Sequence, residues 1–116
     1  MYHYYMSGDP IYTIEKLWEA VSILASGTTS LRRRLYDAYI SSLHVLKSSD
    51  FPDDLKQEFN ELNEALTWVP IEREGEGTLS STTNVMSDDE AKQLANNIVN
   101  LLYEMVNRYP EPKASS

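Results

Sequence analysis

The chain has 116 residues, no cysteine and a formal net charge of −8 at pH 7. Its length fits one domain, and the absence of cysteine excludes disulfides and thiolate metal sites, so the fold rests on packing alone. Hydrophobic residues make up 41% of the chain, which is typical of globular proteins, but no apolar run approaches the ~20 residues that cross a bilayer. The composition predicts a small soluble protein, and we expect it to be cytoplasmic.

The first helix is predicted over residues 10–26. Asp9 can cap its first amides, and Pro10 fits the first turn without the loss of a needed donor. Gly27 is a plausible stop, because a residue without Cβ readily enters the left-handed conformation that closes a helix. The apolar residues recur at helical spacing and are expected to face the core: Ile11, Ile14, Leu17, Trp18, Val21 and Leu24.

Two further helices are predicted over residues 31–47 and 52–68. Ser30 can cap the first of them, and Pro52 with the acids after it suits the first turn of the next. Each carries an apolar stripe at steps of three or four residues. The residues of these stripes are Leu31, Leu35, Tyr39, Leu43 and Leu46, then Leu55, Phe59, Leu62, Leu66 and Val69.

The last helix is predicted over residues 88–109 and has the clearest local signal in the chain. Ser87 and Glu90 match a capping box, and Met86 is placed to pack onto Ala91. Pro110 ends the pattern. The inner stripe is expected to contain Leu94, Ile98, Leu101, Leu102, Met105 and Tyr109.

These segments predict an all-α fold, a single antiparallel four-helix bundle over residues 7–110. An aromatic segment precedes it at residues 1–6, and a flexible tail follows at residues 111–116. Short connections favour antiparallel neighbours for the first three helices. The connection over residues 70–86 is long enough to reach either end of the bundle, so it leaves the direction of the last helix open.

Most of the negative charge lies between residues 50 and 77, where nine acidic residues are balanced by Lys56 and Arg73 alone. Such a concentration creates a directional field that can steer a basic partner. The candidate partner-binding residues are Asp54, Glu58 and Glu61 on one face of a helix, and the alternating Glu72, Glu74 and Glu76 after it. A solvated surface that prevents self-association explains the same charges without any partner.

Eight tyrosines are a high number for this length, and tyrosine is enriched at protein interfaces. Four of them can border the core: Tyr36, Tyr39, Tyr103 and Tyr109. A homodimer through a tyrosine-rich surface is therefore an alternative to a heterologous partner.

Arg32, Arg33 and Arg34 form a basic cluster at the start of the second predicted helix. Charge balance within the chain is the simpler explanation, with Arg33 paired to Asp37 one turn on and a cation–π contact from Arg32 to Tyr36. The cluster lacks the glycine-rich loop or aromatic platform of a nucleic-acid site, so nucleic acid is not an expected partner.

The two histidines, His3 and His44, are too few for a histidine-rich metal site. The helical class is similar to that of the HEPN ribonucleases, but nine residues separate Arg34 from His44, more than the motif of that family allows. A small enzyme acting through Arg34, Tyr39 and His44 is a second alternative. We predict no catalytic residues, metal site or cofactor.

The sequence thus favours a non-enzymatic protein–protein interaction module of inhibitor, immunity or adaptor type that presents an acidic face to a basic partner.

Overall fold

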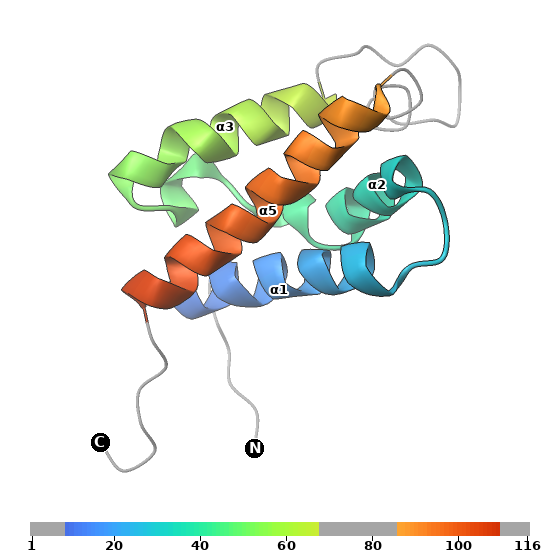
Figure 1. Cartoon of the computed structure of the whole chain (residues 1–116). Coiled ribbons are helices and arrows are strands. Elements are labelled where there is room, and N and C mark those ends of the chain that lie inside the picture. The colour runs from blue at the N-terminus through green and yellow to red at the C-terminus, as the bar shows by residue number, and fades with distance from the viewer. Residues whose placement is uncertain (1–8, 68–85, 110–116) are drawn as a thin grey trace, which may run out of the picture.

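The computed structural model describes residues 9–67 and 86–109 (Figure 1). Four α-helices pack together, and these two ranges contain no strand. The predicted all-α, four-helix architecture is confirmed. Residues 1–6, 111–116 and 68–85, with the connection predicted there, lie outside the described residues. The helices are α1 (Pro10–Ser26), α2 (Leu31–Ser41), α3 (Asp53–Thr67) and α5 (Asp88–Arg108), and the 3₁₀ turns η1 (Leu43–Val45) and η2 (Ser48–Asp50) connect α2 to α3.

Three of the helix starts are capped as predicted. Asp9 accepts a hydrogen bond from the amide two residues on, at 2.8 Å. Ser30 accepts one from the amide of Arg33 at 3.2 Å. At the start of α5 the hydroxyl of Ser87 and the carboxylate of Glu90 each accept from the other residue's amide, at 3.1 and 2.9 Å. Side-chain acceptors thus satisfy amides that have no partner inside the helix.

The central helix is α5, which packs against α1, α2 and α3 and runs between α1 and α3 in Figure 1. Arg108 at its end forms an ion pair with Asp54 at the start of α3, at 2.6 Å, so these two helices are antiparallel. Arg32 at the start of α2 donates to the carbonyl of Met86, just before α5, at 3.0 Å. The helices therefore run up, down, up and down, and this fixes the direction of the last helix.

The end of α2 differs from the prediction, which extended this helix to residue 47. The helix stops at Ser41, because the buried Ser42 leaves helical geometry, with φ −144°, and its hydroxyl donates to the carbonyl of Ala38 at 3.0 Å. A ring nitrogen of His44 lies 3.2 Å from the carbonyl of Tyr39. The Ala38 carbonyl also accepts the helical hydrogen bond from the Ser42 amide, at 3.0 Å, so these side chains bond to the last carbonyls of α2 before the chain goes on as 3₁₀ turns.

The conformation of Gly27 also differs from the prediction. Its φ of −73° and ψ of 154° are extended rather than left-handed. A Cβ atom at this position would lie 2.6 Å from Cδ of Arg34. The glycine is needed for the close approach of that side chain rather than for an unusual backbone conformation.

The core lies where the inner faces of the four helices meet. The predicted inner stripes of α3 and α5 are confirmed within the described residues, and Phe51 adds a ring stacked on Phe59 at 4.6 Å between centroids. The buried residues of these two helices include Leu55, Phe59, Leu62, Leu66, Leu94, Ile98, Leu101, Leu102 and Met105. Those of the first half include Leu17, Ala20, Leu24, Leu35, Leu43 and Leu46.

Two aromatic residues do not lie where the sequence places them. Trp18 was expected in the core and Tyr103 at its border, but the structure leaves each of them 63% exposed. On α1 the buried stripe passes through Leu17 and Ala20, so Trp18 is turned about 100° away from its buried neighbour. Neither aromatic ring is needed to fill the core.

None of the helices among the described residues is long and apolar enough to cross a membrane.

Candidate protein-interaction face

The predicted acidic residues of α3 lie along its edge beside α5, and we call Asp54, Glu58 and Glu61 the α3 acidic strip. The guanidinium of Arg108 donates two hydrogen bonds to the carboxylate of Asp54, at 2.7 and 2.6 Å. The amide nitrogen of Asn100 donates to both oxygens of Glu58, at 3.0 and 3.1 Å. Two of the three acids are therefore engaged by α5.

The ion pair between α3 and α5 changes the acidity of its members. The Arg108 guanidinium lowers the pKa of the exposed Asp54 carboxyl below its usual value, chiefly through their hydrogen bonds. Asp54 and Glu104 together raise the pKa of Arg108, which stays protonated at any physiological pH. The pair joins the two helices, but it also neutralises part of the strip.

The remaining predicted acids are less constrained by the structure. Glu61 accepts a hydrogen bond from Gln57, one turn earlier on the exposed side of α3, at 3.0 Å. Glu72, Glu74 and Glu76 lie outside the described residues. Asp54 and Glu58 both contact α5 and so share one face of α3, and the role of all three acids in binding stays a prediction.

Among the described residues, the partners of the basic cluster at the start of α2 lie outside the acidic residues of α3. Arg32 lies 3.9 Å from Asp88, and Arg33 pairs with Asp37 at 3.3 Å as predicted. The cation–π contact to Tyr36 comes from Arg33, at 4.7 Å, and not from Arg32 as predicted.

Arg34 is separated from the other two residues of the hypothetical enzyme site. Its guanidinium donates to the carbonyl of Leu24 in the last turn of α1 and to that of Thr29 in the connection after it. His44 and Tyr39 lie near the other end of α2, where the Tyr39 hydroxyl donates to Asn63 at 3.2 Å. The structure does not bring these three side chains together.

Among the described residues, no group of three or more His, Asp or Glu side chains is arranged to hold a metal ion.

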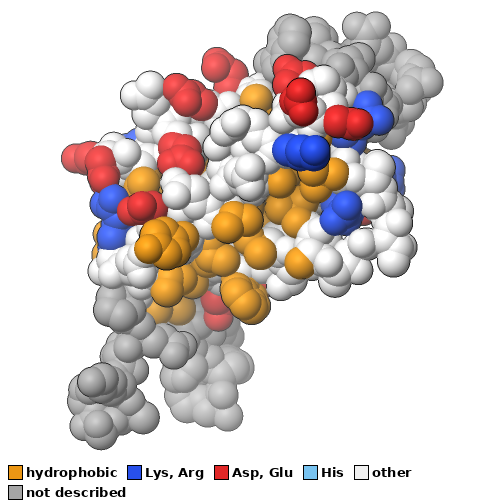
Figure 2. Space-filling model, viewed as in Figure 1, with side chains coloured by type: hydrophobic (Ala, Val, Ile, Leu, Met, Phe, Trp, Pro, Cys, Tyr) orange, Lys and Arg blue, Asp and Glu red, His pale blue; other side chains and the backbone are white. Residues whose placement is uncertain are grey.

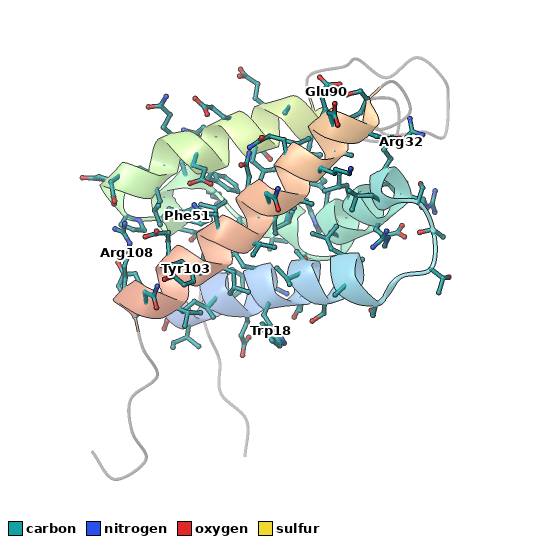
Figure 3. All side chains as sticks on the ribbon, viewed as in Figure 1. Trp18, Arg32, Phe51, Glu90, Tyr103 and Arg108 are labelled. Atoms are coloured by element: carbon teal, nitrogen blue, oxygen red, sulfur yellow. The ribbon has the colours of Figure 1, made fainter. Side chains whose placement is uncertain are left out.

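The most exposed apolar side chains among the described residues gather mainly on α1 and α5, two helices that pack together. We call this surface the α1/α5 apolar face, and define it by Trp18, Val99, Tyr103 and Val106, which are 45–63% exposed. Figure 2 shows hydrophobic atoms as a nearly continuous band along these helices. In Figure 3 the side chains of Trp18 and Tyr103 project outward from their helices.

Half-buried residues connect this face to the core. Ile14 and Val21 lie four residues before and three after Trp18, on the side of α1 that faces α5, and Ala95 lies one turn before Val99 on α5. The apolar surface therefore continues from the interior to the outside of the molecule instead of stopping at the boundary of the core.

The two edges of the face differ in charge. Glu15 and Glu19 lie on the other side of Trp18 from the half-buried Ile14 and Val21, and so form an acidic edge on α1. On α5 the positions beyond Tyr103 are the uncharged Asn96, Asn100 and Asn107, all exposed. The α1 edge of the face is therefore acidic, whereas the α5 edge carries uncharged side chains, of which Asn100 binds the carboxylate of Glu58.

Sequence reasoning missed this face, although a signal for it was present. The apolar stripe of residues 10–26 includes Ile11 and Trp18 in addition to the residues that the core needs. Within the described residues α1 packs against both α2 and α5, and the stripe extends beyond these contacts, so that Trp18 is left exposed.

Comparison of the chain with protein-family models, with curated proteins and with solved structures finds no match.

Proposed function

We propose that this protein is a non-enzymatic protein–protein interaction module, and that its contact surface is centred on the α1/α5 apolar face. The observation that supports this most is the exposure of Trp18 and Tyr103, 63% each, on neighbouring helices. Aromatic residues are enriched among the few side chains that dominate binding energies, because they bury a large area and lose little conformational freedom.

The composition around the face supports the same proposal. Its rim consists of exposed glutamate and asparagine side chains, and apolar patches rimmed by polar groups are typical of interaction sites. A side chain placed in water stabilises the fold little, so these rings are unexplained by folding alone. Binding of another protein would give them a function.

Variants of the exposed residues test the proposal. Wild-type protein and the double variant Trp18→Ser/Tyr103→Ser are immobilised, and the proteins that each retains from a lysate of the source cells are quantified. Ile40→Ser is the matched control, because Ile40 is 48% exposed but lies on α2. We expect a partner retained by the wild type and by the control to be reduced at least about tenfold with the double variant, a change of ~1.4 kcal/mol.

Two results would contradict the proposal. One is a set of retained proteins that does not differ between the wild type and the double variant. The other is a partner lost equally with Ile40→Ser. Unfolding of each variant by urea is measured in parallel, and we expect the exposed substitutions to change stability by no more than about 0.5 kcal/mol.

The α3 acidic strip is proposed as an additional contact for a basic partner. Arg108 neutralises Asp54 and Asn100 occupies Glu58 through hydrogen bonds, so we expect the substitution of Glu58 and Glu61 by Gln to weaken binding less than the loss of the aromatic residues. The amount of the same partner retained by the Glu58→Gln/Glu61→Gln variant and by the Trp18→Ser/Tyr103→Ser variant, at low and high salt, compares the two effects.

A further inference from the structure

We infer that the partner of the α1/α5 apolar face is a basic amphipathic helix, with an apolar stripe on the face and lysine or arginine along the edge that lies over α1. This inference rests on the proposed function and adds the chemistry of the partner.

The shape of the face fits a helix. Its apolar positions on α5 recur at helical spacing from Ala95 through Val99 to Val106, a rise of about 16 Å. On α1, which runs antiparallel to α5, the exposed Trp18 and the half-buried Ile14 and Val21 form a second row. An amphipathic helix of about three turns covers this length with apolar residues at positions i, i+3, i+4 and i+7, and packs against both rows as one helix packs on a helical pair.

The charges around the face determine which edge of the partner helix carries basic residues. Glu15 has no ion pair with a described residue, and Glu19 has one with Lys16 at a long 3.6 Å. Their edge of α1 therefore keeps net negative charge. A basic side chain of the partner placed there gains a complementary contact, whereas an acidic one is repelled.

The other charges near the face leave the α1 edge acidic. On the α5 side the carboxylate of Glu58 accepts from Asn100, so its hydrogen-bonding capacity is partly used there. Lys16 also lies 5.7 Å from the ring of Tyr12, on the far side of α1 from the face. Arg108 is held by Asp54 and Glu104 at the end of α5. Lys92 lies in the same row as Val99, two turns earlier, and without an ion pair to a described residue. We therefore expect the partner helix to carry an acidic or neutral residue over Lys92.

A second copy of this chain is a poorer occupant. Two molecules that each carry a net charge of −8 repel one another. Each copy would also bring its own Glu15 and Glu19 to the interface. A basic helix lacks both disadvantages.

Synthetic peptides test the inference directly. The first is a short helix with leucine at i, i+3, i+4 and i+7 and lysine along one edge. The second has glutamate in place of lysine, and the third has the first composition in shuffled order. Each is titrated into ¹⁵N-labelled protein that carries Trp68→Phe, so that the remaining indole signal belongs to Trp18. Its binding is read from that signal and from the amides of Val99, Tyr103 and Val106.

We expect the lysine peptide to shift these signals and to bind about tenfold tighter than the glutamate peptide at low salt, with the ratio falling as salt is added. The shuffled peptide should bind about tenfold more weakly, since its apolar residues no longer form one stripe. Glu15→Gln/Glu19→Gln should reduce the affinity for the lysine peptide several-fold. The matched variant Asp53→Asn/Glu64→Gln removes the same charge from α3, at exposed positions outside the α3 acidic strip, and should leave that affinity within about twofold.

Several results would overturn the inference. Equal binding of the lysine and glutamate peptides at the face would leave the proposed function intact but remove the basic partner. An equal effect of Glu15→Gln/Glu19→Gln and of the control on α3 would show that only net charge matters. Failure of every peptide to bind would exclude the helix, while the immobilisation experiment judges the proposed function separately.

Two other occupants have distinct signatures. Dimers in sedimentation would assign the face to a second copy. A shift of the Trp18 indole signal on deletion of residues 1–8, with no peptide present, would assign it to the chain's own first residues. Either result overturns the inference.

Discussion

The side chain of Arg34, which lies on α2, caps the C-terminal end of α1. Its guanidinium donates to the carbonyl of Thr29, at 3.0 Å, and to that of Leu24 in the last turn of α1. Carbonyls at a helix end lack partners inside the helix, so a cation placed there satisfies them and interacts favourably with the helix dipole. The approach is possible because Gly27 leaves space for the aliphatic part of the arginine.

Gly27→Ala tests this arrangement. At an extended φ of −73° alanine is unstrained and would ordinarily stabilise the protein by about 0.4–1 kcal/mol, because it restricts the unfolded chain. Here the new Cβ would displace Arg34, so we expect a destabilisation of about 1 kcal/mol. In an Arg34→Ala background the same substitution should be neutral or stabilising. Urea unfolding of the wild type, the two single variants and the double variant gives the coupling free energy between residues 27 and 34. Additive changes in the free energy of unfolding would contradict the prediction.

The pH dependence of the α3/α5 ion pair follows from the direction of one pKa shift. The Arg108 guanidinium lowers the pKa of Asp54 in the folded protein, so the unfolded chain binds more protons as the pH drops below about 4. The stability from this pair is present above the unfolded pKa and is lost as the pH falls through the folded one. We expect ¹³C NMR titration of the Asp54 carboxyl to show the low pKa, and Arg108→Gln to return it to the ordinary range. An unchanged pKa in that variant would assign the shift to another cause.

At the scale of the elements, the first turn of α5 is stabilised by hydrogen bonds from its own residues and from α2. Ser87 and Glu90 cap it, and the capping hydrogen bonds lower the pKa of the Glu90 carboxyl. Arg32 fixes the preceding carbonyl of Met86, whose side chain is buried. The start of this helix therefore has both local and tertiary support.

We expect Ser87→Ala to destabilise the protein by about 1 kcal/mol, the usual cost of the loss of an N-cap hydroxyl. Ser26→Ala is the control, because the hydroxyl of Ser26 donates to a carbonyl of its own helix and is exposed. It should change stability by no more than about 0.5 kcal/mol. Thermal unfolding by circular dichroism measures both, and equal effects would show that the cap at Ser87 contributes nothing particular.

The helix starts were predictable because capping is a short-range interaction. Asp9, Ser30 and Ser87 each act on an amide within three residues, so the sequence contains the whole interaction. The end of α2 was not predictable in the same way. Ser42 is buried and bonds backwards to Ala38, and the apolar spacing of Leu43 and Leu46 fits a helix or successive 3₁₀ turns equally well.

The candidate site was predictable only in part, for a similar reason. Periodicity shows that Trp18 belongs to the apolar side of its helix, but it does not show how far the core extends around that side. The charges of Asp54 and Glu58 are visible in the sequence, whereas the ion pair of Asp54 with Arg108 and the hydrogen bonds of Glu58 with Asn100 are not. These partners are more than 40 residues apart, so only the folded arrangement brings them together.

At the scale of the whole molecule, two contacts fix the position of α5. Arg108 joins its end to the start of α3, and Arg32 joins its beginning to the start of α2. With these ends fixed, the apolar residues of α5 divide between a buried row and an outer one beside α1. The exposed face is thus a consequence of the topology as much as of the sequence of either helix.

We expect the chain alone to be monomeric at micromolar concentration. A dimer through the α1/α5 apolar face would bring the exposed Glu15 and Glu19 of both copies to one interface, where like charges repel. The net charge of −8 adds repulsion between copies, which is strongest at low salt. Sedimentation velocity at low and high salt measures the mass, with Trp18→Ser/Tyr103→Ser as the control. A wild-type dimer at low salt that the variant abolishes would contradict the expectation and would make this face a homodimer interface.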